Sequence, residues 1–225
     1  MKVSVIIPTL NEAESIARVV AEIPREEVAE IIVADSGSGD GTREIAAAAG
    51  AKVLLVPERG YGRACAAGSE IATGEILVFM DGDGADRGDL VGRLVAPIRE
   101  GRMDFVIAAR TKAGRAKGAM SAHQVFAGYA LGLAMYALTG TRYTDMCAFR
   151  AIRRDVLLGL GMREMTYGWN IEMQFLAARR GLRILEVPLP YRCRIGGESK
   201  VAGSVRGTIR ASTRIIGTFV RVARG

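Results

Sequence analysis

The sequence of 225 residues contains few cysteines and almost no histidine. Its three cysteines, Cys65, Cys147 and Cys193, are far apart, odd in number and without metal-ligand spacing. We therefore expect reduced, mostly buried thiols of a cytosolic protein, which excludes a disulfide framework. The single histidine, His123, lies in a mostly apolar segment, where such a residue is more often packed than catalytic.

Several motifs and segments are also absent. The loop after the first predicted strand has no Gly-x-Gly-x-x-Gly, and no Walker lysine motif occurs. The longest stretch without charge, residues 118–141, contains Ser121, His123 and Gln124 and is too polar for a membrane-spanning helix. Because Lys2 is followed at once by a short strand-like run, we expect neither a spanning segment nor a signal peptide.

The sequence contains enough apolar residues to form a core, and it carries an excess of positive charge. It is 49% hydrophobic, with a formal net charge of +7 and a pI near 9.7. This composition predicts one folded domain, with or without an appended element. The charge favours anionic partners, which include nucleotides, lipid headgroups and nucleic acid.

Short apolar runs alternate with helical segments along the first half of the chain. Strands are predicted at residues 3–8, 30–35, 52–56, 76–80 and 105–109. Helices are predicted at residues 11–23, 43–49 and 62–72, the first with Asn11 as its N-cap. This alternation predicts an α/β fold with a Rossmann-like, mostly parallel central sheet and helices on both faces.

The strand at 76–80 ends in acidic residues separated by glycines, Asp81-Gly82-Asp83. Open α/β sheets bind ligands at the carboxyl ends of their strands, and hard oxygen ligands suit Mg²⁺ or Mn²⁺. A solvated acidic turn is the structural alternative, because Asp and Gly are common in turns. The flanking sequence favours the functional interpretation.

Ordered blocks on both sides of this motif resemble glycosyltransferase family 2. In the first half they are Pro8-Thr9-Leu10-Asn11-Glu12, Asp35-Ser36-Gly37-Ser38-Gly39-Asp40-Gly41-Thr42, Gly60-Tyr61-Gly62 and Asp81-Gly82-Asp83. Blocks at residues 144–150, 170–174, 186–188 and 194–200 are similar to the dolichol-phosphate mannose synthase branch, which includes bacterial polyprenyl-phosphate glycosyltransferases. The resemblance covers about residues 3–204.

The resemblance implies a GT-A fold, a UDP- or GDP-sugar donor, a Mg²⁺ or Mn²⁺ cofactor and inverting transfer of a hexose to polyprenyl phosphate. By position it assigns nucleotide-sugar binding to Pro8, Thr9, Glu12, Asp35, Gly62, Asp81 and Gly82. The implied metal ligands are Asp81 and Asp83, and the implied catalytic positions are Asp83, Arg110, Asp145 and Glu172. For the acceptor and its phosphate, the implied residues are Arg194, Ser199 and Lys200, and the candidates are Arg115 and Lys117.

Two positions depart from the family pattern. Ser36 stands where the family has a second aspartate, which leaves the donor base open. Ala85 stands where a polar residue often follows the Asp-x-Asp motif, so the metal shell is open to completion by the diphosphate, by water or by Asp86.

The acceptor decides whether a general base is needed. A sugar hydroxyl must lose a proton during attack, whereas a lipid phosphate is already anionic near neutral pH. A lone Glu172, without a following Asp, fits a phosphate acceptor better, although it is also explained as an ordinary polar residue of a helix. The alternative within the family is a soluble hydroxyl acceptor with Asp145 or Glu172 as base.

A nucleotide-sensing or nucleic-acid-binding module is a third interpretation, and the lack of an RNA-binding aromatic motif argues against it.

Two segments suggest contact with an anionic membrane surface. Residues 126–138 are apolar and predict either an interfacial helix or a buried core helix. Residues 205–225 predict a basic amphipathic helix appended to a catalytic domain at 1–204. Its arginine stripe consists of Arg206, Arg210, Arg214, Arg221 and Arg224. We interpret this stripe as a surface anchor on the cytoplasmic membrane face, against the alternative of a solvated helix packed on the domain.

Overall fold

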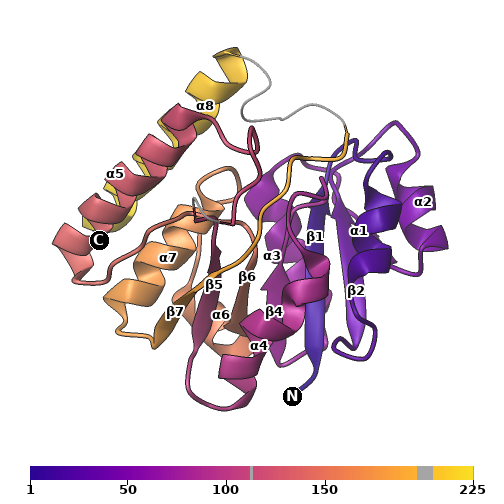
Figure 1. Cartoon of the computed structure of the whole chain (residues 1–225), viewed down its shortest axis with the longest axis horizontal. Coiled ribbons are helices and arrows are strands. Elements are labelled where there is room, and N and C mark those ends of the chain that lie inside the picture. The colour runs from indigo at the N-terminus through magenta and orange to yellow at the C-terminus, as the bar shows by residue number, and fades with distance from the viewer. Residues whose placement is uncertain (112–113, 197–204, 225) are drawn as a thin grey trace.

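The computed structural model describes residues 1–111, 114–196 and 205–224, which contain one seven-stranded sheet with helices around it (Figure 1). The strands are β1 (Val3–Thr9), β2 (Glu30–Asp35), β3 (Lys52–Leu55), β4 (Ile76–Phe79), β5 (Phe105–Ala109), β6 (Arg150–Arg153) and β7 (Ile184–Pro188). The helices are α1 (Ile16–Glu22), α2 (Thr42–Ala48), α3 (Tyr61–Ile71), α4 (Val91–Arg99), α5 (Ala122–Thr139), α6 (Arg154–Leu160), α7 (Trp169–Arg179) and α8 (Val205–Arg224), with a short 3₁₀ turn at Gly88–Leu90.

The strand order across the sheet is β3-β2-β1-β4-β6-β5-β7. Strand β6 runs antiparallel to both its neighbours, and the other pairs are parallel. The central strands are fully buried along almost their whole length, which explains their continuous apolar sequences. The α/β fold with a mostly parallel sheet is therefore confirmed.

Helix α1 begins later than the sequence predicts. The predicted N-cap, Asn11, has a left-handed backbone with φ of 54°, and the helix starts only at Ile16. The reason is that Asn11 binds the loop after β2 instead of capping a helix. Its backbone N–H donates to Ser38 Oγ at 2.8 Å, and its side-chain oxygen accepts from the Gly39 N–H at 3.0 Å. Glu12 consequently lies in the turn before α1.

Helix α5 is apolar but not buried. Of the α5 residues whose burial the structure describes, Gly132 and Met135 are buried, whereas Phe126 is 73% exposed. The core-helix alternative for residues 126–138 is therefore wrong. Across the described residues, the structure contains no helix with the length and apolar character needed to span a membrane.

Helix α8 packs against α7, and its residues Ala211, Thr218 and Val222 are buried. Phe219 also meets Phe175 of α7 edge to face, with ring centroids 5.8 Å apart. The predicted boundary between residues 204 and 205 falls at residues 197–204, which lie outside the described part of the chain. The division into a domain at 1–204 and a helix at 205–225 stays a prediction.

Candidate active site

A cleft of about 460 Å³ lies beyond the carboxyl ends of β1, β4 and β5. Its polar wall includes Pro8, Thr9, Glu12, Asp81, Gly82, Asp83, Arg110, Asp145 and Arg194. Its apolar wall includes Met120, Ala127, Leu131 and, from α8, Ile215. The sheet edge therefore brings together most of the residues that the sequence assigns to the site, and two helices add a wall of different character.

Three carboxylates cluster after β4. Asp81 and Asp83 line the cleft, and Asp86 is buried behind them, where it accepts the Asp81 backbone N–H at 3.1 Å. Burial, and then repulsion by Asp86 and Asp83, raise the pKa of Asp81 well above its ordinary value. Burial also raises the pKa of Asp86. This is a site of crowded negative charge that a cation would stabilise.

The donor set at this point fits a divalent ion. Asp81 and Asp83 present carboxylate oxygens to the cleft, and Mg²⁺ is commonly held by one or two carboxylates together with substrate phosphates. Within residues 1–111, 114–196 and 205–224, no three His, Cys, Asp or Glu side chains converge as a ready metal site. Asp81 and Asp83 are thus the carboxylates after β4 that line the cleft and could hold the ion.

Arg110, at the end of β5, forms a forked ion pair with Asp145. Its Nε and Nη2 donate to the two carboxylate oxygens at 2.7 and 2.6 Å, and its backbone N–H donates at 2.8 Å. The guanidinium also lies 5.0 Å from the centre of the Tyr191 ring. Burial would raise the pKa of Asp145, but hydrogen bonds from Arg110 lower it below its ordinary value. Asp145 is therefore a stable anion that fixes Arg110 in the cleft.

Glu12 and Arg194 connect two distant parts of the chain across the cleft. Arg194 Nη2 lies 3.3 and 3.4 Å from the two carboxylate oxygens of Glu12. The segment that carries Arg194 is also held to the Asp-x-Asp loop, because the Ile195 N–H donates to the Asp83 carbonyl at 2.9 Å. Both residues line the cleft, as the sequence predicts.

Asp35 is placed differently from the expectation that it contacts the nucleoside. Its buried carboxylate accepts hydrogen bonds from Thr9, Ser38 and Arg43, and Ser36 lines the cleft in its place. Burial would raise the pKa of Asp35, but these hydrogen bonds lower it. Asp35 thus holds the loop after β2. Ser36, the position that departs from the family pattern, faces the cleft.

The glycines at the start of α3 allow close contact with the segment before α7. Gly60 lines the cleft, whereas Gly62 is buried under the carbonyl of Glu164. The Arg63 N–H donates to the Met165 carbonyl at 2.9 Å. Gly62 therefore supports the cleft wall through backbone packing, and the structure does not place it among the lining residues.

Substituting Gly62 with alanine is expected to destabilise the protein by about 2 kcal/mol, since overpacking commonly costs that much. The added Cβ would lie 2.6 Å from the Glu164 carbonyl oxygen, and backbone cannot move aside as a side-chain tip can. Denaturant unfolding measures the change. Gly159→Ala in α6 is the control, because its Cβ meets nothing within 4 Å. Equal stability of the two variants would contradict the packing account.

Glu172 is also placed differently from the expectation. Its buried carboxylate accepts the backbone N–H groups of Arg163 and Glu164 at 2.9 and 2.7 Å and pairs with Arg221 of α8 at 3.0 Å. Glu172 does not line the cleft. On α7, Asn170 faces the cleft, whereas Glu172, two residues later, faces α8.

Arginines of α8 therefore serve an internal purpose. Arg214 pairs with the buried Glu164 at 3.1 Å, and Arg221 pairs with both Glu164 and Glu172. Burial would raise the pKa of Glu164, but hydrogen bonds, first from Thr166 and Thr218, lower it. Two members of the predicted membrane-facing stripe thus face the protein, which is a correction to that prediction.

The acceptor candidates are only partly brought to the cleft. The backbone of Arg115 forms an isolated β-bridge with Tyr191, and its side chain donates a hydrogen bond to the Met120 sulfur. Lys117 is exposed. Neither Arg115 nor Lys117 lines the cleft. Ser199 and Lys200 lie outside the described residues.

Sequence reasoning did not assign Tyr191, Asn170, Gln124 or Ser212, which line the cleft. No local signal marks them, because they belong to segments that approach the cleft only after folding.

The comparisons with known proteins agree with this geometry. Residues 4–161 match the model of glycosyl transferase family 2. An uncharacterized glycosyltransferase of Mycobacterium tuberculosis is 37% identical over 214 residues, covering 93% of this chain and 94% of the relative. The undecaprenyl-phosphate mannosyltransferase of Micrococcus luteus is 32% identical over 222 residues, covering 92% and 90%.

Among solved structures, this chain is similar to glucosyl-3-phosphoglycerate synthase of Mycobacterium tuberculosis in complex with Mn²⁺, UDP-glucose and phosphoglyceric acid. The TM-score is 0.79 at 27% identity, over 99% of this chain and 79% of the synthase. The expected GT-A fold is thereby confirmed, as is the resemblance to the polyprenyl-phosphate branch, and the Mn²⁺ in that synthase agrees with the divalent metal cofactor expected here. The chain belongs to glycosyl transferase family 2.

Proposed function

We propose that this glycosyltransferase moves a hexose from a UDP- or GDP-sugar to polyprenyl phosphate at the cytoplasmic face of the membrane. One observation carries the proposal: the cleft has a charged wall around Asp81, Asp83 and Arg110 and an apolar wall from α5 and α8. A nucleotide-sugar suits the first wall, and a phosphate with an apolar chain suits the junction of both. The Micrococcus luteus relative, named for undecaprenyl phosphate, supports the same acceptor class.

The carboxylates also favour an acceptor that needs no general base. Asp145 gives both its oxygens to Arg110, and Glu172 is buried away from the cleft. A phosphate oxygen can attack the anomeric carbon without losing a proton. The new bond to the phosphate oxygen forms as the bond to the nucleoside diphosphate breaks, with inversion at the anomeric carbon.

The residues of the cleft have separate tasks in this reaction. Asp81 and Asp83 would hold the divalent ion, which when bound stabilises charge on the leaving diphosphate. Arg110, kept in position by Asp145, provides fixed positive charge near the transferred group. Arg194 and Glu12, which form an ion pair at 3.3 Å on the cleft wall, would lie against the donor.

A second candidate is transfer to a soluble hydroxyl acceptor. The observation that favours it is the similarity to a synthase solved with UDP-glucose and phosphoglyceric acid. This reaction would need a base, with Asp145 as the candidate that lies in the cleft. It predicts activity without lipid and a bell-shaped dependence of kcat/KM on pH.

A radiolabel transfer assay tests both candidates. UDP- and GDP-sugars are offered with Mn²⁺ or Mg²⁺ to a short polyprenyl phosphate, to 3-phosphoglycerate or to water alone. We expect label from one donor to enter the organic phase only when polyprenyl phosphate is present. Label that stays aqueous as a soluble glycoside would overturn the lipid acceptor and favour the hydroxyl acceptor.

A further inference from the structure

The outer face of α5 is apolar and exposed. Residues 122–139 contain no Asp, Glu, Lys or Arg. Phe126, Tyr129, Leu133 and Tyr136, here called the α5 stripe, are 73%, 62%, 59% and 53% exposed. Their spacing of three and four residues places them on one side of the helix. A helix that is apolar on most of its surface is normally covered, so the α5 stripe indicates an interaction site.

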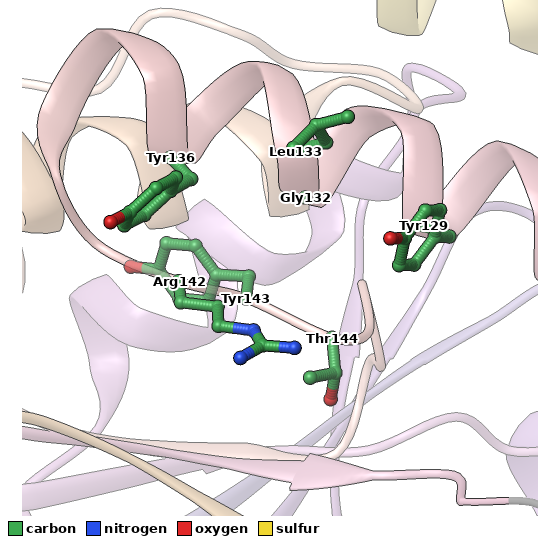
Figure 2. Close-up of a pocket in the computed structure, with 7 residues that line it drawn as sticks. All are labelled: Tyr129, Gly132, Leu133, Tyr136, Arg142, Tyr143 and Thr144. Carbon is green, nitrogen blue, oxygen red and sulfur yellow. The ribbon is translucent and has the colours of Figure 1, made fainter.

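A small pocket lies directly beside the α5 stripe. Figure 2 shows Tyr129, Leu133 and Tyr136 above Arg142, and Gly132, Tyr143 and Thr144 complete the lining. Its volume is about 270 Å³. The exposed Arg142 guanidinium has no hydrogen bond or ion pair with any residue that the structure describes. The pocket thus combines an available fork of donors with aromatic and aliphatic walls.

The charged residues that flank α5 in the sequence are basic. Between residues 110 and 144 the sequence has no Asp or Glu. Of its basic residues there, Arg110 is paired with Asp145 and Lys112 lies outside the described residues, which leaves Arg115, Lys117 and Arg142. Glu186 lies close to the pocket through hydrogen bonds to Thr144, but its carboxylate is not part of the lining. Positive charge beside an exposed apolar stripe is the pattern of a surface that binds anionic lipid.

We propose that the α5 stripe inserts into an anionic bilayer and that the Arg142 pocket binds the phosphate of a lipid headgroup. Two of the four side chains of the α5 stripe, Tyr129 and Tyr136, are tyrosines, which suit the boundary between headgroups and acyl chains. An arginine fork suits a phosphate group. A second copy of the chain is a poorer occupant, because a two-fold interface would bring the same basic residues of both copies together.

Vesicle co-sedimentation tests the stripe, with phosphatidylcholine vesicles that contain or lack phosphatidylglycerol. The double variant Phe126→Ser/Leu133→Ser is expected to weaken binding to anionic vesicles at least tenfold, since two large apolar side chains no longer enter the bilayer. Leu158→Ser in α6 is the matched control, because Leu158 is 59% exposed, like Leu133. Both variants change exposed residues, and thermal unfolding verifies that they remain folded.

Arg142 has its own test. Arg142→Gln is expected to lower affinity for anionic vesicles about fivefold and to leave binding to phosphatidylcholine alone unchanged. Arg142→Lys keeps the charge but loses the fork, so it should recover only part of the affinity. The control is Arg18→Gln, an exposed arginine of α1, and α1 and α5 lie on opposite sides of the molecule (Figure 1). Full recovery by lysine would overturn the headgroup pocket.

Three results would overturn the membrane site as a whole. They are wild-type protein that fails to bind either vesicle, a Phe126→Ser/Leu133→Ser variant that binds like wild type, and equal loss in Leu158→Ser. A dimer of the wild type that the double variant dissociates would assign the stripe to a second copy instead. This inference goes beyond the proposed function, because vesicle binding is measured without any sugar transfer. Vesicle binding without label transfer would therefore reject the proposed acceptor and leave the membrane site standing.

Discussion

Replacing Asp83 with asparagine is expected to lower kcat by about 10³-fold. Asparagine has nearly the same size but no charge, so the ion on the donor diphosphate would be held poorly. A bound metal contributes several kcal/mol to charge stabilisation in such reactions, and about 4 kcal/mol corresponds to a factor of about 10³. Asp81→Asn should reduce turnover similarly, because its carboxylate lines the same part of the cleft.

The fold should survive the Asp83 substitution. In the structure the Asp83 carboxylate accepts the Ala85 N–H at 3.0 Å, and the amide oxygen of asparagine can accept the same bond. The Ile195 N–H binds the backbone carbonyl of Asp83, which the substitution leaves in place.

Steady-state kinetics across a Mn²⁺ titration separates weaker metal binding from lost catalysis. The control is Asp89→Asn, which changes an exposed acid that also follows β4 but does not line the cleft. Its kcat should stay within about twofold of wild type, because most surface substitutions have small effects. An Asp83→Asn enzyme with nearly the full rate would refute the metal assignment.

Replacing Arg221 with alanine is expected to reduce the free energy of unfolding by about 2 kcal/mol. The carboxylates of Glu164 and Glu172 are only 3% and 2% exposed, and Arg221 pairs with both. Removing one partner of a buried ion pair commonly costs about 3–5 kcal/mol. We expect less here, because the Arg221 side chain is 44% exposed and water screens part of the pairing.

A double-mutant cycle checks that the cost arises from the pair. Glu172→Gln removes the buried charge, so Arg221→Ala should cost less in that background, with a coupling of at least about 0.5 kcal/mol. Arg224→Ala is the matched control, because Arg224 lies one turn further along α8 and forms no ion pair within the described residues. If chemical denaturation gave Arg221→Ala and Arg224→Ala the same free energy of unfolding, an internal role for the arginines of α8 would be contradicted.

The parts of the fold that sequence predicts well are those that local chemistry determines. The bounds of β2 and β5 agree with the predicted strands, because a short apolar run bounded by polar residues usually forms a buried strand in an α/β protein. Asp81 and Asp83 line the cleft for a similar reason, since a strand that ends in acids places them at the ligand edge of the sheet.

Side-chain direction at the site could not be predicted in this way. Asp35 and Glu172 occupy positions with matching motifs, yet the first binds its own loop and the second binds α8. Their partners are chosen by packing between distant segments, which a single sequence does not reveal. Likewise, Arg221 belongs to a basic stripe by spacing, and only the neighbouring buried carboxylates determine where it points.

The strand order has a consequence for how the chain folds during synthesis. Strands β1 to β4 find partners among themselves, but β5 pairs with β6 and β7, which are made later. Both edges of the apolar segment Phe105–Ala109 are open until residues 150–153 have emerged from the ribosome, and one edge stays open until residues 184–188 follow. Open strand edges of this kind associate with other chains, so β5 is the segment that most needs a chaperone's protection.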